Sequence, residues 1–163
     1  TDMSELSFEE FLPLRLSIGV SFDLGGLLSN RTIWDNLMLP LLYNKIYNFD
    51  EAEARADRLV SAFGITPYKW ERPASVPGGV RKAACVARAF VMDPSLIILD
   101  EPTTGLNSEG LLALDFEMSR VRRRGAIVIF ASRDEIFKAK WATSTLHIQA
   151  GSLDLKKLKG VSS

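Results

Sequence analysis

Short apolar runs alternate along the chain with segments whose apolar positions recur every three or four residues. Residues 16–22 predict a buried strand, and "LIILD" at residues 96–100 suits a parallel strand that is covered on both faces. Residues 126–132 predict a further strand, and residues 145–155 a hairpin that turns at residues 150–151. Strands separated by helical segments predict an α/β fold.

Residues that start and stop helices occur before and between these strands. Ser7 with Glu10 has the spacing of a capping box, and Asp50 with Glu53 is expected to open a longer helix that Gly64 ends. One face of that longer helix is apolar, with Ala52, Ala56, Leu59, Val60 and Phe63. A helical unit is therefore expected in the middle of the chain.

The second half repeats the alternation of helix and strand. Glycines at residues 78–79 lead an alanine-rich helix, and Asn107 or Ser108 caps another. Residues 33–90 are predicted to form a helical subdomain with this glycine-led helix. Residues 91–163 are predicted to hold the apolar strand, its acids and the C-terminal hairpin.

Composition narrows the possible functions. The 163 residues, 47% hydrophobic and 25% charged, suit one globular domain, and twenty basic residues balance twenty acidic ones. No global field therefore favours nucleic acid, and the basic run at residues 122–124 suits a solvated helix end. The single cysteine, Cys85, permits no internal disulfide, and no apolar run reaches the roughly 18 residues of a spanning helix. A soluble chain from a reducing compartment is expected.

Two adjacent acids, Asp100 and Glu101, follow the apolar run "LIIL". Open α/β sheets bind ligands at the carboxyl ends of their strands. In a nucleotide site Asp100 would hold Mg²⁺, usually through water, and Glu101 would orient and polarise the attacking water. The alternative is a strand that ends in two solvated acids before a turn at Pro102.

The surrounding motifs make the nucleotide site the stronger interpretation. "VPGGVRKAACVARAF" runs directly into "VMDPSLIILDEPTTGLNSEG", and together they resemble the signature loop, Walker B strand and D-loop of the ATP-binding cassette family. The resemblance implies a P-loop NTPase (RecA-like) core, mostly parallel, with an inserted helical subdomain. It also implies ATP and Mg²⁺, a second ATP-binding subunit, a transmembrane permease and a place on the cytoplasmic face of the inner membrane. "GGVRK" further resembles the ATPases of Mla/Mce lipid transporters.

Residue by residue, the resemblance assigns Gly78 and Gly79 to the signature loop, which contacts a γ-phosphate bound on the opposite subunit. Pro77 stands where the family has serine, so a hydroxyl and a backbone N–H are missing. Val80 replaces glutamine or methionine. This part of the site is predicted to be weakened.

Three further positions depart from the family pattern. Asp23 stands for the Q-loop glutamine, Asn107 for the D-loop aspartate and Arg133 for the switch histidine. An arginine can neutralise phosphate but cannot reproduce the hydrogen bonding of histidine. His147, the only histidine, is interpreted as a structural residue of the hairpin.

The phosphate-binding P-loop is absent from this sequence. Its motif, Gly-x-x-x-x-Gly-Lys followed by Ser or Thr, surrounds phosphates with backbone amides. The one glycine pair at that interval, Gly105 and Gly110, is followed by two leucines. The N-terminal strands and P-loop are therefore expected to be missing, either because the chain is a fragment of a longer ATPase or because it is a natural pseudo-ATPase with a regulatory or structural role. An unrelated α/β domain is the third hypothesis.

An apolar segment, residues 32–47, is predicted to receive the coupling helix of a permease. The docking region as a whole is expected to extend over residues 23–47. Packing within the helical unit is the alternative explanation for its apolar residues, which are Trp34, Leu37, Met38, Leu41, Leu42 and Tyr43.

Overall fold

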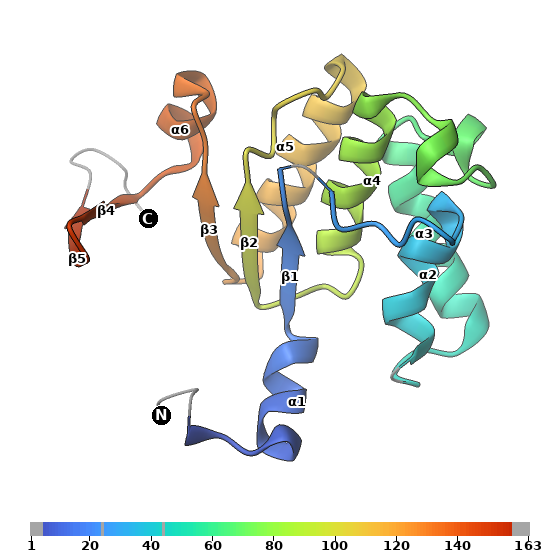
Figure 1. The fold of residues 1–163 in the computed structure, drawn as a ribbon, viewed down its shortest axis with the longest axis horizontal. Coiled ribbons are helices and arrows are strands. Elements are labelled where there is room, and N and C mark those ends of the chain that lie inside the picture. Colours follow the sequence, from blue (N-terminus) through green and yellow to red (C-terminus); the bar gives the residue numbers. More distant parts are fainter. Residues whose placement is uncertain (1–4, 24, 44, 158–163) are drawn as a thin grey trace. The chain divides into compact units, whose positions relative to one another are not determined.

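The computed structural model describes residues 5–23, 25–43 and 45–157, and divides the chain into two units after Ala131. The first unit contains a parallel sheet in the order β1-β2-β3 (Figure 1). Its strands are β1 (Ile18–Ser21), β2 (Leu96–Asp100) and β3 (Ile127–Ala131). The predicted α/β class with a parallel sheet is confirmed.

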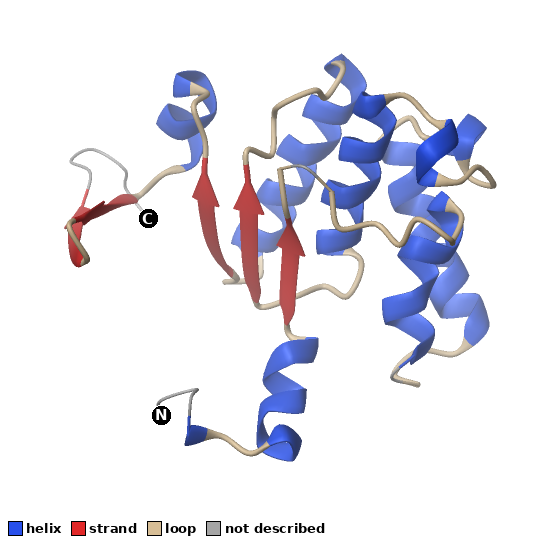
Figure 2. Ribbon diagram, in the orientation of Figure 1, coloured by secondary structure: helices blue, strands red, loops and turns tan. Residues whose placement is uncertain are grey.

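Five helices of the first unit accompany this sheet (Figure 2). They are α1 (Phe8–Leu16), α2 (Ile33–Tyr43), α3 (Phe49–Ala62), α4 (Gly78–Phe90) and α5 (Ser108–Arg123), with short 3₁₀ turns at Thr66–Tyr68 and Pro73–Ser75. Helix α4 is central, because it packs on β1 and β2 and also contacts α2, α3 and α5. Nearly every residue from Lys82 to Phe90 is buried.

The sheet is covered on one face within the described part of the first unit. On β2, Ile97 and Leu99 are buried, whereas Ile98 is 38% exposed. Its register neighbour on β3, Ile129, is 44% exposed, and Ile127 is 64% exposed. The expectation of a strand covered on both faces was wrong within the described residues of the first unit, since no described helix of this unit lies against the second face (Figure 1).

The helix caps follow the local sequence with one difference. Ser7 and Glu10 form the expected capping box. Helix α3 begins earlier than expected, because Asn48 is its cap and pairs with Glu51 in a capping box, where Asp50 and Glu53 had been predicted. The side-chain oxygen of Asn48 accepts a hydrogen bond from the N–H of Glu51, so the motif lies two residues before the predicted one.

Gly19 allows α4 to lie directly on β1. A Cβ built at this position would lie 1.9 Å from the backbone oxygen of Ala89 on α4. A larger residue in β1 would therefore push the helix away from the strand. The tight contact fixes α4, whose first residues carry the predicted signature glycines.

The second unit is described by itself. It contains α6 (Glu135–Trp141) and an antiparallel hairpin of β4 (Ser144–Gln149) and β5 (Ser152–Lys157). The hairpin turns at Ala150 and Gly151, which have φ of 48° and 79°, as expected for a two-residue turn. Among the described residues, no helix combines the length and hydropathy that a membrane span requires.

Candidate functional site

The two predicted acids lie where the central strand ends. Asp100 is the last residue of β2 and is exposed. Glu101 follows with φ of 43°, a conformation that residues other than glycine rarely adopt. Its backbone N–H donates to the carbonyl of Ala131 at 2.9 Å. The acids therefore stand at the carboxyl edge of a parallel sheet, as the sequence predicted.

The signature glycines lie at the start of α4. Gly78 is its first residue, and Pro77 is an N-cap whose side chain makes no capping hydrogen bond. Since the first amides of a helix have no intrahelical acceptor, the glycine end of α4 can present N–H groups to an anion. A Cβ built at Gly79 would lie 2.6 Å from the carbonyl oxygen of Gly105, so a side chain here would displace the loop that follows β2.

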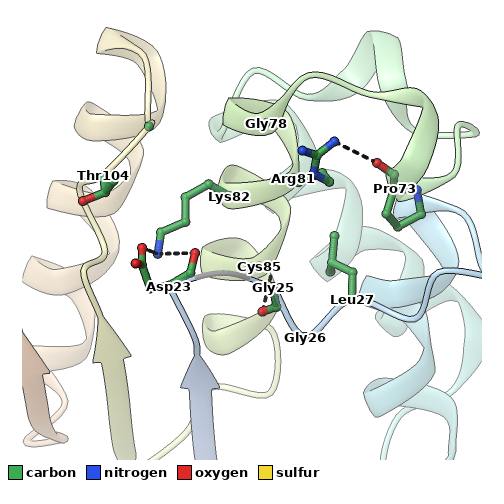
Figure 3. Close-up of a pocket in the computed structure, with 11 residues that line it drawn as sticks. Asp23, Gly25, Gly26, Leu27, Pro73, Gly78, Arg81, Lys82, Cys85 and Thr104 are labelled. Carbon is green, nitrogen blue, oxygen red and sulfur yellow. Dashed lines mark hydrogen bonds and ion pairs between the residues drawn. The ribbon is translucent and has the colours of Figure 1, made fainter.

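A cavity of about 460 Å³ connects these segments (Figure 3). Its lining comes from the loop after β1, the 3₁₀ turn Pro73–Ser75, helix α4 and the loop after β2: Asp23, Gly25, Gly26, Leu27, Pro73, Gly78, Arg81, Lys82, Cys85, Thr104 and Gly105. The structure thus brings Asp23 and Gly78, which lie 55 positions apart in the sequence, to one cavity. The loop that contains Thr104 completes the wall.

Lys82 is a residue of this site that the sequence interpretation did not single out. Its side chain is 6% exposed, and its ammonium group donates to the carbonyl of Asp100 at 2.9 Å. The same group lies 3.4 Å from the carbonyl oxygens of Phe22 and Asp23 and 3.5 Å from the Asp23 carboxylate. A lysine inside an alanine-rich helix was the available signal, because a buried lysine requires partners.

The loop after β1 is also attached to α4 by two other side chains. The Cys85 thiol lies 3.4 Å from the carbonyl oxygen of Gly25, and Arg88 donates to the carbonyl of Gly26 at 2.6 Å. Burial raises the pKa of the Cys85 thiol, although Arg88 and Lys82 oppose that increase. A protonated, buried thiol is a structural group, so Cys85 is part of the core.

Two predicted site residues, Asn107 and Arg133, do not line the cavity. Asn107 is the N-cap of α5, and its side-chain oxygen accepts a hydrogen bond from the N–H of Gly110 at 2.8 Å. Arg133 belongs to the second unit, is exposed and precedes α6. Their assigned roles toward a nucleotide stay predictions.

The predicted partner segment divides into two sets of residues. Trp34, Leu37, Met38 and Leu41 are buried, so packing within the helical unit explains them. Leu42 is 37% exposed and Tyr43 is 79% exposed. The nearby Ile46 and Phe49 are also exposed.

The residues fit one part of a magnesium nucleotide site. Mg²⁺ in such sites commonly takes one or two carboxylates and completes its shell with phosphate oxygens and water. The exposed carboxylate of Asp100 is suited to this role, and the glycine end of α4 is suited to a phosphate. No group of three or more metal-binding side chains occurs among the described residues. The amides and lysine of a P-loop are not in this sequence.

A parallel sheet with paired acids at its carboxyl edge, beside a helix that starts in two glycines, is an arrangement typical of nucleotide-binding α/β proteins. The family model for ABC transporter matches residues 1–104. The chain belongs to this family, as the ATP-binding cassette motifs had indicated.

Individual relatives agree with this assignment. The chain is 37% identical over 109 residues to the methionine import ATP-binding protein MetN of Cutibacterium acnes, covering 67% of this chain and 30% of that protein. It is 34% identical over 149 residues to the uncharacterized ABC transporter ATP-binding protein YvrO of Bacillus subtilis, covering 90% of this chain and 63% of YvrO. The chain thus spans less than two thirds of these relatives. The relatives give no support to the predicted lipid-transport subgroup.

Solved structures support the fold. The dimeric post-hydrolysis state of the ATP-binding cassette MJ0796, bound to ADP and Pi, aligns with a TM-score of 0.81. The alignment covers 96% of this chain and 70% of that chain at 23% identity. The predicted cassette fold, a P-loop NTPase core with a parallel sheet, is therefore confirmed.

Proposed function

We propose that this chain is part of the ATP-binding subunit of an ABC transporter, in which ATP binding and hydrolysis drive transport through a membrane permease. The observation that carries the proposal is the placement of Asp100 and Glu101 at the carboxyl end of the central strand β2. In this role Asp100 would hold Mg²⁺ through water, and Glu101 would orient and polarise the water that attacks the γ-phosphate. The name of MetN and the ABC transporter family match support the assignment.

The remaining site residues act across a pair of cassettes. Gly78 and Gly79 present helix N–H groups to the γ-phosphate of a nucleotide held by a second ATP-binding subunit. By the family resemblance, Asp23 would act near the metal, Asn107 at the contact between subunits and Arg133 on phosphate. The dimeric MJ0796 cassette is consistent with a paired arrangement. Because its basic and acidic residues balance, nucleic acid is not a proposed partner.

The permease docks on the side of the cassette formed by residues 23–47. The exposed aromatic ring of Tyr43 and the exposed Ile46 are suited to anchoring a short amphipathic helix. Such docking would place the cassette peripherally on the cytoplasmic face of the inner membrane. The permease selects the molecule that is transported. Relatives named for methionine import favour a small polar cargo over a lipid.

The alternative of an inactive regulatory cassette rests on the altered positions Pro77, Asp23 and Arg133, and it gains no support from relatives named as import ATP-binding proteins. These substitutions act on the rate of hydrolysis, since each removes or changes a group near the phosphate or metal. A cassette completed by a P-loop is therefore expected to hydrolyse ATP slowly.

A chimera that supplies the P-loop segment of a related cassette to this chain tests the proposal. Glu101→Gln should lower ATP turnover by about 10²-fold or more, because general-base assistance contributes that much, while nucleotide binding persists. The matched control is Glu53→Gln at an exposed position of α3, which should leave turnover unchanged. Pro77→Ser should raise turnover, since serine restores an N–H and a hydroxyl. Equal turnover in the Glu101→Gln variant and its parent would refute the assignment.

A further inference from the structure

Lys82 is a buried cation that connects two segments of the site. Its ammonium group, on a side chain 6% exposed, carries three N–H donors and has acceptors on the end of β2 and on the segment after β1. An unpaired buried charge is strongly unfavourable, so this geometry requires those acceptors to remain in place. Figure 3 shows the side chain extending from α4 toward Asp23.

The peptide between Asp100 and Glu101 is held at both of its polar ends. Lys82 donates to its carbonyl oxygen at 2.9 Å, and its N–H donates to the carbonyl of Ala131 at 2.9 Å. Rotation of this peptide would break both hydrogen bonds. Glu101 has φ of 43°, a conformation that persists when its surroundings hold it.

The same ammonium group reaches the segment that follows β1. It lies 3.4 Å from the carbonyl oxygens of Phe22 and Asp23 and 3.5 Å from the Asp23 carboxylate. In the sequence, Phe22 lies 60 positions before Lys82, and Asp100 lies 18 positions after it. One side chain therefore ties the ends of two neighbouring strands to α4.

We propose that Lys82 is a positioning residue that orients Glu101, through the Asp100–Glu101 peptide, and couples that orientation to the segment at Asp23. The inference rests on the proposed ATPase function, in which Glu101 acts on the attacking water. Lys82 itself contacts neither water nor nucleotide in this role. It sets the backbone from which the Glu101 carboxylate projects, so its removal should affect the reaction more than the binding of ATP.

Amide hydrogen exchange on the full chain tests the geometry directly. In Lys82→Met, which keeps an unbranched side chain but removes the charge, the Glu101 amide should exchange about 10-fold faster or more, as expected when a charge-assisted hydrogen bond is lost beside it. Lys82→Arg retains a donor and should stay within about threefold of the parent. Lys69→Met is the matched control, because Lys69 is another mostly buried lysine, paired with Asp57 of α3. It should leave the exchange rate of the Glu101 amide unchanged.

The P-loop chimera supplies the second measurement. Lys82→Met should lower kcat by about 10²-fold with KM within about threefold, since misplacing a catalytic group costs rate more than affinity. If the parent chimera has no turnover, the proposed function fails, and the exchange measurement still decides the role of Lys82. Parental exchange at Glu101 in Lys82→Met would overturn the inference. Equal acceleration at all amides of β2 would also overturn it, because that result describes general loosening of the strand.

Discussion

At Asp93, arginines from two helices meet a single carboxylate. Arg55 of α3 lies 2.6 Å away, Arg124 beside α5 lies 2.9 Å away, and Arg120 of α5 also pairs with it. Burial is the largest influence on the pKa of Asp93 and raises it, but the hydrogen bonds and charges of Arg55 and Arg120 together outweigh burial and lower the pKa. Asp93 thus links α3 to α5.

This pKa predicts how stability depends on pH. Because the folded pKa lies below the unfolded value of about 3.9, the contribution of Asp93 is complete well above pH 4 and is lost as the pH falls through that value to the folded pKa. Asp93→Asn removes the charge, and asparagine tolerates the observed φ of 51°. Urea unfolding from pH 6 to pH 2 should show a shallower pH dependence for this variant than for the parent. Glu135→Gln, at a position 84% exposed, should leave the slope unchanged, and parallel curves for Asp93→Asn would contradict the prediction.

At the scale of elements, the position of α4 depends on its contact with β1. Gly19→Ala places a methyl group 1.9 Å from a backbone oxygen of α4, which cannot move unless the helix moves. Overpacking of this kind costs about 1–3 kcal/mol, and a rigid backbone neighbour favours the upper end of that range. Urea unfolding with linear extrapolation should show this loss in the free energy of unfolding.

Gly78→Ala provides the comparison for that helix. The nearest atom to its built Cβ is a guanidinium nitrogen of Arg81 at 3.7 Å, an ordinary contact. Its free energy of unfolding should remain within about 0.5 kcal/mol of the parent, as for surface substitutions in general. Equal stability of the two variants would show that α4 can shift on β1 without cost.

At the scale of the whole molecule, the chain contains the acidic and signature parts of a cassette without a P-loop. We expect the chain by itself to bind Mg-ATP with a Kd weaker than about 1 mM, because the amides and lysine that surround the phosphates are missing. Isothermal titration calorimetry measures this directly. The P-loop chimera serves as the positive control, and a micromolar Kd for the unmodified chain would contradict the expectation.

Much of this protein followed from short-range sequence patterns. The acids after "LIIL" and the turn at residues 150–151 each depend on a few neighbouring residues, so spacing and periodicity were sufficient. For the cap of α5, the sequence left Asn107 and Ser108 open, and the structure has Asn107. The cap of α3 was misplaced because Asn48 and Asp50 both suit an N-cap, and local sequence does not choose between them.

Tertiary structure decided the features that join distant segments. Lys82 and Phe22 are 60 positions apart, and Arg55 and Asp93 are 38 apart, so neither contact leaves a periodic pattern in the sequence. The burial of Trp34 and the exposure of Tyr43, both on α2, depend on where neighbouring elements pack. Sequence alone therefore determined which chemical groups the protein has at the ends of its elements, whereas folding determined which of those groups meet, because burial and pairing are properties of contacts between elements.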